Sequence, residues 1–99
     1  MATKEPKCKS QDYFNALKFY GVVTDKRLDK DQHSIPILVL VDLNEKVEIK
    51  VDFFLEKTNS YKNLNINDTI FKPSNSDSLY VIKNNVKTLL QKVQFDCVN

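Results

Sequence analysis

The chain has 99 residues, 41% of them hydrophobic and 28% charged, and its 15 basic and 13 acidic side chains leave a formal net charge of +2. This length and composition predict one soluble globular domain with a modest core. The lysines are scattered and Arg27 is the single arginine, which argues against a continuous phosphate-binding track and so against nucleic acid as a partner. The longest apolar run, residues 35–41, is too short to span a bilayer, so no transmembrane segment is expected.

The chain is expected to begin with a flexible leader, because residues 1–10 are polar and rich in lysine. The folded domain would then cover residues 11–99. Residues 10–16 allow two structures, a short helical turn capped by Ser10 or an extended approach to the first strand. The sequence leaves both open.

Three β-strand patterns follow in the first half of the chain. They cover residues 16–24, 35–41 and 46–54. The third alternates apolar and charged side chains, and this period of two is typical of a strand with one face on a core. The reversals between the strands predict an antiparallel meander, and the polar residues 25–34 predict an exposed loop at the tip of the first hairpin. Gly21, the one glycine, falls inside the first strand and indicates a bulge or a sharp bend.

The second half of the chain offers shorter signals. Residues 59–64 fit either a short helix or an irregular loop. Asn67 belongs to a turn signal, where small barrels often carry glycine, and asparagine can also take a positive φ. Residues 78–83 predict a strand, followed by a tight reversal at Asn84 and Asn85. Residues 86–97 fit a helix or a strand, and the asparagine turn and the β-rich neighbours favour the strand.

The pattern as a whole indicates a mainly β fold. Five or six strands, with a bend at Gly21, predict a small antiparallel OB-like barrel or a strongly twisted sheet, with at most one short helix. The predicted order is three meandering strands, a connecting segment and then further strands. This order matches that of an oligonucleotide/oligosaccharide-binding (OB) barrel.

Several short motifs also resemble a known group of proteins. They are Phe19-x-Gly21-Val22-Val23, Asp25-Lys26, His33-x-x-Pro36, the turn at Asn67, Lys72 and the strand that begins at Ser78. Over residues 19–97 they resemble a family of uncharacterised small exported bacterial proteins, often lipoproteins. The resemblance implies an OB-like β-barrel in the cell envelope and supplies no known activity or site.

Two cysteines lie near the two ends of the chain, Cys8 and Cys97. The termini of small domains often lie close together, so the two thiols could form a disulfide that closes nearly the whole chain. Such a bond would indicate an oxidising compartment, a periplasm or a cell surface. The alternative is two unrelated free thiols in a cytoplasmic protein, and the sequence leaves both open.

No residue pattern indicates catalysis, a cofactor or a metal. His33 is the single histidine, and with Asp29 and Asp31 it could supply metal ligands. The stretch lacks the glycine and the closing glutamate of a calcium loop, and zinc would require more Cys or His. One glycine is too few for a phosphate-binding loop. We therefore expect a protein that is not an enzyme, and a metal-dependent enzyme at these three residues is the weaker hypothesis.

Binding is the function that the sequence contradicts least. Four aromatic side chains could leave an exposed patch for a protein or glycan partner: Tyr20, Phe54, Tyr61 and Tyr80. We expect a monomeric, non-catalytic interaction module of the cell envelope. The alternative is a single-stranded nucleic-acid binder, since OB-like barrels stack bases on aromatic side chains. Phe19 and Phe53 are expected to point into the core, which leaves fewer rings for such stacking.

Overall fold

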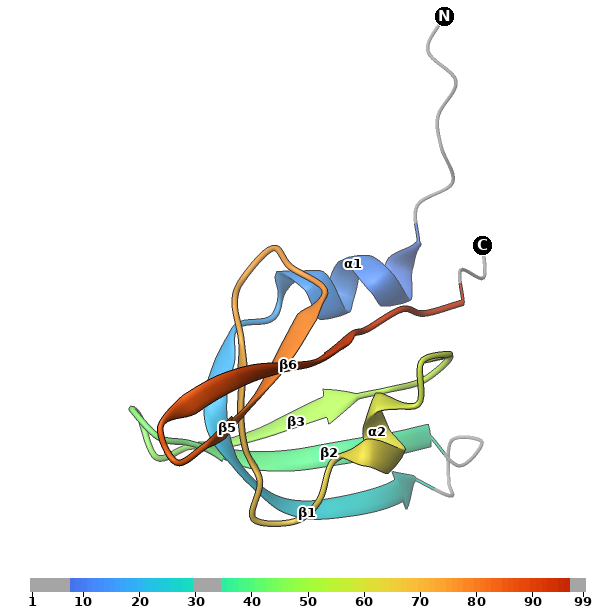
Figure 1. Cartoon of the computed structure of the whole chain (residues 1–99). Coiled ribbons are helices and arrows are strands. Elements are labelled where there is room, and N and C mark those ends of the chain that lie inside the picture. The colour runs from blue at the N-terminus through green and yellow to red at the C-terminus, as the bar shows by residue number, and fades with distance from the viewer. Residues whose placement is uncertain (1–7, 30–34, 97–99) are drawn as a thin grey trace, which may run out of the picture.

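The computed structural model describes residues 8–29 and 35–96, and within them the chain forms two helices and one antiparallel sheet of six strands (Figure 1). The elements in chain order are α1 (Lys9–Ala16), β1 (Phe19–Asp29), β2 (Ile35–Asp42), β3 (Glu48–Asp52), α2 (Ser60–Asn63), β4 (Thr69–Lys72), β5 (Ser78–Lys83) and β6 (Val86–Lys92). The prediction of a mainly β fold is confirmed. The first helix begins two residues before the predicted start of the domain.

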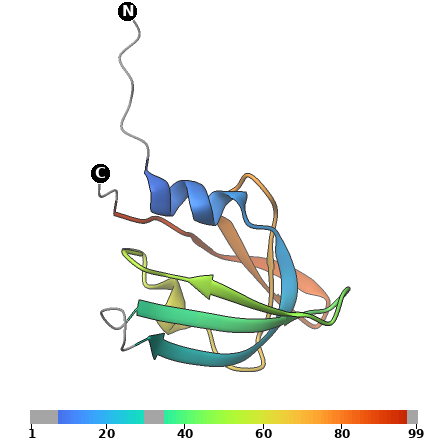
Figure 2. The ribbon, with the colours of Figure 1, turned by 180° about the vertical axis from the view of Figure 1, so that it is seen from behind.

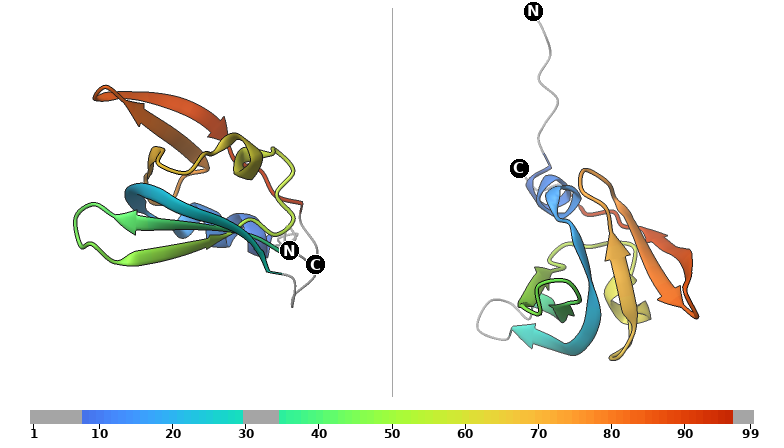
Figure 3. Two further views of the ribbon diagram at one scale, coloured as in Figure 1. Left: turned by 90° about the horizontal axis from the view of Figure 1, so that it is seen from below. Right: turned by 90° about the vertical axis from the view of Figure 1, so that its left-hand side faces the viewer.

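The sheet has the order β3-β2-β1-β4-β5-β6, with every neighbouring pair antiparallel. Its two halves, β1-β2-β3 and β4-β5-β6, curl toward each other (Figure 3). A fourth strand beside the first, after a three-strand meander, is the arrangement expected for an OB-like fold. The curl does not close into a continuous barrel: the two ends of the sheet meet at an isolated bridge between Glu56 and Phe95. Of the two predicted forms, a small barrel and a strongly twisted sheet, the structure shows the twisted sheet.

The described residues contain one helix of eight residues, α1, and the four-residue α2, where the sequence predicted at most one short helix. Both segments that the sequence left open, residues 10–16 and 59–64, contain helix. An eight-residue helix is too short to be stable through propensity alone. Instead, α1 is held by tertiary contacts: Phe14 is fully buried, and the Gln11 amide hydrogen-bonds the segment after β6. Those contacts come from distant parts of the chain, and the local sequence does not reveal them.

The strand β1 runs to Asp29, so the prediction that residues 25–29 belong to a loop is wrong. These residues pair in register with the first residues of β2. The loop is expected because residues 25–34 are polar and charged, but the strand continues past a bulge between Val23 and Asp25, which shifts the alternation of side chains by one position. Lys26 then shares a face with buried Leu38, and its Nζ donates to the carbonyl oxygen of Leu64, the residue that follows α2. The rest of the predicted loop, residues 30–34, lies outside the described residues.

Gly21 allows β2 to approach β1 closely. A Cβ atom at this position would lie 2.4 Å from the carbonyl oxygen of Val41 and 2.7 Å from Cδ1 of Leu40. The first of these is a backbone atom, so a side-chain rotation could not relieve the contact. The absence of a side chain at Gly21 therefore permits the close contact of β1 with β2. The bulge that the sequence indicated at Gly21 lies instead after Val23.

The asparagine turns and the last strand agree with the sequence-based expectations. Asn67, Asn84 and Asn85 have φ angles of 79°, 51° and 62°, in the left-handed region that asparagine tolerates. The strand β5 has the predicted bounds, and β6 occupies the first part of residues 86–97. The strand alternative for that last segment is therefore confirmed.

Three phenylalanines from distant parts of the chain meet inside the curled sheet. Ring centroids are 5.5 Å apart for Phe14 and Phe95, 5.9 Å for Phe14 and Phe53, and 6.4 Å for Phe53 and Phe95. We call these three residues the phenylalanine trio. Phe14 comes from α1, Phe53 follows β3 and Phe95 follows β6, so the trio joins the helix to both ends of the sheet. Phe19 is also buried, as predicted, and packs in the same core.

Lys72 is a fully buried lysine where α1 meets the sheet. Its Nζ donates hydrogen bonds to the carbonyl oxygens of Asn15 at 2.9 Å, Leu17 at 2.6 Å and Pro73 at 2.8 Å, which uses all three ammonium protons. Two of these carbonyls lie at the C-terminal end of α1, where the helix dipole favours a cation. Burial lowers the pKa of Lys72 to about 8, and the charge of Asp77 opposes this shift in part.

We expect Lys72→Met to lower the free energy of unfolding by about 2–4 kcal/mol, because three carbonyl groups lose their donor. Urea unfolding at pH 7, followed by circular dichroism, measures the change. Lys18→Met, at an exposed position close to α1, is the matched control and should change stability by less than about 0.5 kcal/mol. Equal small effects at both positions would contradict the role given to Lys72.

The lowered pKa of Lys72 also predicts how the stability of the fold depends on pH. Below pH 8, Lys72 is charged in the folded and the unfolded chain, and the cost of burying the charge is present in full. Between about pH 8 and 10.5 the unfolded chain keeps the proton that the folded chain releases, so stability from this group rises with pH. Burial raises the pKa values of Tyr13 and Tyr61, which acts in the opposite direction above the usual tyrosine range. Over the interval from pH 8 to about 9.5, the unaltered chain should therefore gain stability relative to Lys72→Met.

Candidate functional site

Three aromatic side chains form a row across the outer face of the sheet. Tyr20 on β1 pairs in register with Phe71 on β4, and Phe71 pairs with Tyr80 on β5. The ring centroids of Tyr20 and Phe71 are 6.2 Å apart, and those of Phe71 and Tyr80 are 6.1 Å apart. The residues just before them on the three strands lie in the core: Phe19, Ile70 and Leu79. The row therefore faces outward, and we call Tyr20, Phe71 and Tyr80 the aromatic ladder.

The strand β6 extends the aromatic ladder toward the edge of the sheet. The Nζ of Lys87 lies 4.9 Å from the ring centroid of Phe71 and 5.0 Å from that of Tyr80, which is a cation–π geometry. Leu89 pairs in register with Tyr80, and 46% of its surface is exposed. The outer face of β4, β5 and β6 thus presents aromatic rings, an ammonium group and an exposed leucine next to one another.

The structure brings together two of the four predicted surface aromatics, Tyr20 and Tyr80. Tyr61 is held on the interior side of the sheet, because its ring packs against that of Phe53 at a centroid distance of 6.1 Å. Its hydroxyl donates to the carbonyl oxygen of Arg27 at 3.1 Å. Tyr61 therefore fastens α2 to β1 and is not part of the aromatic ladder.

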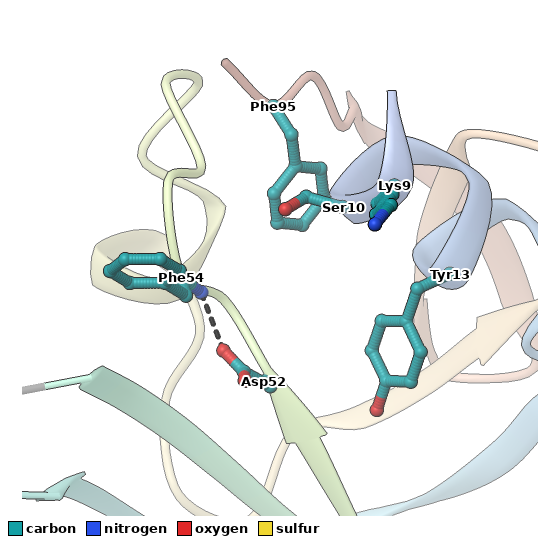
Figure 4. A pocket seen from close by; sticks show the side chains of 6 residues that line it. All are labelled: Lys9, Ser10, Tyr13, Asp52, Phe54 and Phe95. Carbon is teal, nitrogen blue, oxygen red and sulfur yellow. Dashed lines mark hydrogen bonds between the residues drawn. The ribbon is translucent and has the colours of Figure 1, made fainter. Parts of the chain in front are cut away.

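Phe54, the fourth predicted aromatic, lies at a pocket of about 320 Å³ between α1 and the end of β3. The lining residues, shown in Figure 4, are Lys9, Ser10, Tyr13, Asp52, Phe54 and Phe95. Asp52 Oδ1 accepts a hydrogen bond from the Phe54 backbone N–H at 2.6 Å. The ring of Phe54 lies on the side away from α1 (Figure 4), so it does not stack across the pocket on Tyr13.

This pocket could hold a small polar ligand. Lys9 offers an ammonium group, Ser10 a hydroxyl and Asp52 a carboxylate. Tyr13 adds a phenol that can donate a hydrogen bond, and burial, together with the charge of Asp52, raises its pKa. The volume is at the lower end for small-molecule sites, and Tyr13 and Phe54 both stay partly exposed. The pocket is thus a shallow second candidate beside the aromatic ladder.

Sequence reasoning missed Phe71 and Lys87. In the sequence Phe71 forms an apolar pair with Ile70, and alternation places one of the two outward. Its position beside Tyr20 and Tyr80 depends on the register of three strands, and the register of a short strand is set by distant turns and core contacts. Lys87 has no local signal that separates it from other solvated lysines.

The metal hypothesis is not tested by the described residues. Within residues 8–29 and 35–96, no group of three His, Cys, Asp or Glu side chains is placed to hold a metal ion. Asp31 and His33 lie outside the described residues, as does the side chain of Asp29, so a metal site there stays a prediction. Neither helix in the described part of the chain is long and apolar enough to cross a membrane.

Cys97 lies outside the described residues, so its pairing with Cys8 stays a prediction. The surroundings of Cys8 are defined, because it directly precedes α1. The side-chain amide of Gln11 accepts a hydrogen bond from the Phe95 N–H and donates one to the Val93 carbonyl, both at 2.9 Å. The start of α1 and the segment after β6 therefore run side by side (Figure 2).

Comparison of the chain with protein-family models, with curated proteins and with solved structures finds no match. The resemblance to small exported bacterial proteins therefore stays a prediction. Function has to be inferred from the aromatic ladder and its surroundings.

We expect Phe71→Leu to lower the free energy of unfolding by about 1–2 kcal/mol, because it removes the ring contacts with two aromatic neighbours and with the Lys87 ammonium. Phe54→Leu is the matched control, since Phe54 is exposed and pairs with no other ring among the described residues. The control should cost less than about 0.5 kcal/mol. Urea unfolding measures both, and equal costs would show that the ladder is not an interacting unit.

Proposed function

We propose that this chain is a non-catalytic interaction module that binds a protein or glycan partner through the aromatic ladder. One observation carries the proposal: Tyr20, Phe71 and Tyr80 form a contiguous row of rings on the outer face of the sheet. Aromatic side chains are enriched at the centre of protein interfaces. Tyrosine also offers a large contact area at a low cost in conformational entropy.

The shape of this surface favours a protein over a small glycan. Small ligands and catalytic reactions both need concave sites that exclude water. The aromatic ladder instead lies on the outward face of a curled sheet, and Lys87 and Leu89 enlarge it toward the edge. A broad surface of this kind suits the flat interfaces that proteins form with one another.

Single-stranded nucleic acid is the alternative partner. Bases stack on aromatic rings that have a free face. Tyr20 meets Phe71 edge to face, with an interplanar angle of 75°, and the Lys87 ammonium lies over both Phe71 and Tyr80. A base would have to displace these contacts, and nucleic acid is therefore the second candidate.

The proposed location is the cell envelope, with Cys8 and Cys97 joined by a disulfide. The support is the position of Cys8 at the start of α1, close to where Gln11 hydrogen-bonds Val93 and Phe95. A bond between the two cysteines would tie α1 to the C-terminal segment, where Gln11 already joins them. Such a bond persists in an oxidising compartment and would be reduced in the cytoplasm.

Site-specific photo-crosslinking in the native cells tests the proposed function. A benzophenone amino acid at position 80, in the aromatic ladder, should give a discrete protein adduct. The same group at position 62, exposed on α2, is the control and should give none. Tyr20→Ser should reduce the adduct at position 80, since it removes a neighbouring part of the same surface.

Two results would overturn that proposal. The first is the absence of any adduct at position 80, with a protein or with a glycan, or equal adducts at both positions. The second is tight binding of a labelled single-stranded oligonucleotide that weakens steeply with salt and is lost in Tyr80→Ser, which would favour the nucleic-acid alternative.

The location has a separate test, the intact mass of exported protein with and without alkylation under non-reducing conditions. A disulfide predicts the loss of two hydrogens and no alkylation. Cys8→Ser is the control, and its remaining thiol should be alkylated once or form a dimer. Two alkylated thiols in the unaltered protein would contradict the disulfide and favour the cytoplasm.

A further inference from the structure

The strand β6 is at one end of the sheet and leaves one of its edges open. Asn84 and Asn85 both have left-handed φ angles and form a two-residue hairpin loop closed by Lys83 and Val86. In such a hairpin the closing pair exchanges hydrogen bonds, and the next pair along does not. The peptide groups of Val86 and Thr88 therefore face β5, while those of Lys87 and Leu89 face away from it.

The open edge of β6 has outward-facing backbone groups and lies beside a cavity. No hydrogen bond outside the β5–β6 pairing involves the backbone of Lys87 or Leu89 in the described residues. A cavity of about 270 Å³ lies between this strand and the segment after α2. Its lining residues are Asn63, Asn65, Asp68, Val81, Lys83, Thr88, Leu89 and Leu90. An extended chain beside β6 would thus find unpaired peptide groups and an adjoining space for side chains.

The charge of this hairpin has one sign. Residues 78–92 contain Lys83, Lys87 and Lys92 and no Asp or Glu. In the described part of the chain, none of the three lysines forms an ion pair. Opposite charges on neighbouring strands stabilise a sheet, and like charges directly opposite each other destabilise it. The chemistry that complements this edge is therefore an acidic strand.

We infer that β6 binds an extended, acidic segment of a partner protein as an added strand. The inference rests on the proposed binding function and names the mode and the chemistry of the partner. Main-chain hydrogen bonds to Lys87 and Leu89 would supply affinity, and side chains at alternate positions would supply specificity. Since Leu89 continues the row that starts at Tyr20, an apolar residue of the added strand would extend the aromatic ladder by one position.

A second copy of this chain fits the edge less well. Two β6 strands side by side would bring Lys87 and Lys92 of one copy close to the lysines of the other. Lysines on an open edge protect a sheet against self-association. The same lysines attract an acidic partner, so the edge disfavours a second copy of this chain and favours an acidic strand.

Two short synthetic peptides of the same length test the inference by NMR, one alternating Glu with Val and the other alternating Lys with Val. We expect the acidic peptide alone to shift the amide signals of Lys87 and Leu89 and to slow their hydrogen exchange. Leu89→Pro removes the outward N–H and should weaken binding about tenfold or more. Leu89→Ala keeps that N–H and should weaken binding less, and circular dichroism of both variants shows that the sheet is retained.

Three results would overturn the added strand: equal binding of both peptides, unchanged binding by Leu89→Pro, or self-association through β6 in the absence of peptide. These results are distinct from failure of the proposed function. If crosslinking at position 80 succeeds while the amides of β6 stay unprotected, the aromatic ladder binds its partner face on and the strand-addition mode is wrong. If crosslinking at position 80 fails as well, both inferences are lost.

Discussion

The contact among Phe14, Phe53 and Phe95 is the constraint on which the rest of this fold depends. The pairing of β1 with β4 connects the two halves of the sheet on one side, but on the other side an isolated bridge between Glu56 and Phe95 contributes little backbone pairing to hold the free ends together. The phenylalanine trio does this with side chains, because its members come from α1, from the end of β3 and from the segment after β6. All three rings are buried, and burial of a large side chain contributes about 1.5–3 kcal/mol. Loss of one ring would therefore loosen the helix and both ends of the sheet at once.

Lys72 supplies hydrogen-bond donors for carbonyl groups that lie where α1 ends against the core. Placing α1 over the interior buries the carbonyl groups at its C-terminal end, and buried carbonyls without donors are costly. Lys72 donates to Asn15 and Leu17 and also to Pro73, and its Nζ lies 5.1 Å from the ring of Phe14. A lysine inside a small core is thus explained by geometry: it is the group that lets a short helix end against the sheet. Its lowered pKa is the measurable sign of that burial.

Much of the sheet could be predicted from the sequence, because alternation is a local signal. The strand β5 has the predicted bounds, and Phe53 lies on the buried face that the pattern assigns to it. The helix α1 and the end of β1 could not be predicted, since one depends on distant contacts and the other on a bulge after Val23. The same limit applies to the candidate site. Tyr20 and Tyr80 could be named from the sequence as candidate surface aromatics, and both are half-buried in the structure. Phe71 and Lys87 join them only through a strand register that no local pattern reveals.

The edge strand β3 and the strands that carry the aromatic ladder present different side chains on the outer face of the sheet. On β3 the outward positions carry Glu48, Lys50 and Asp52, the charged side chains that a solvated sheet normally presents. On β1, β4 and β5 the outward positions in register carry Tyr20, Phe71 and Tyr80. Cross-strand aromatic pairs stabilise a sheet by about 0.2–1 kcal/mol each, but pairs of opposite charge or of threonine serve the same purpose while presenting polar groups to water. The contrast within one sheet, together with the open and basic edge of β6 beside the rings, supports the proposal that a partner binds at the aromatic ladder and β6.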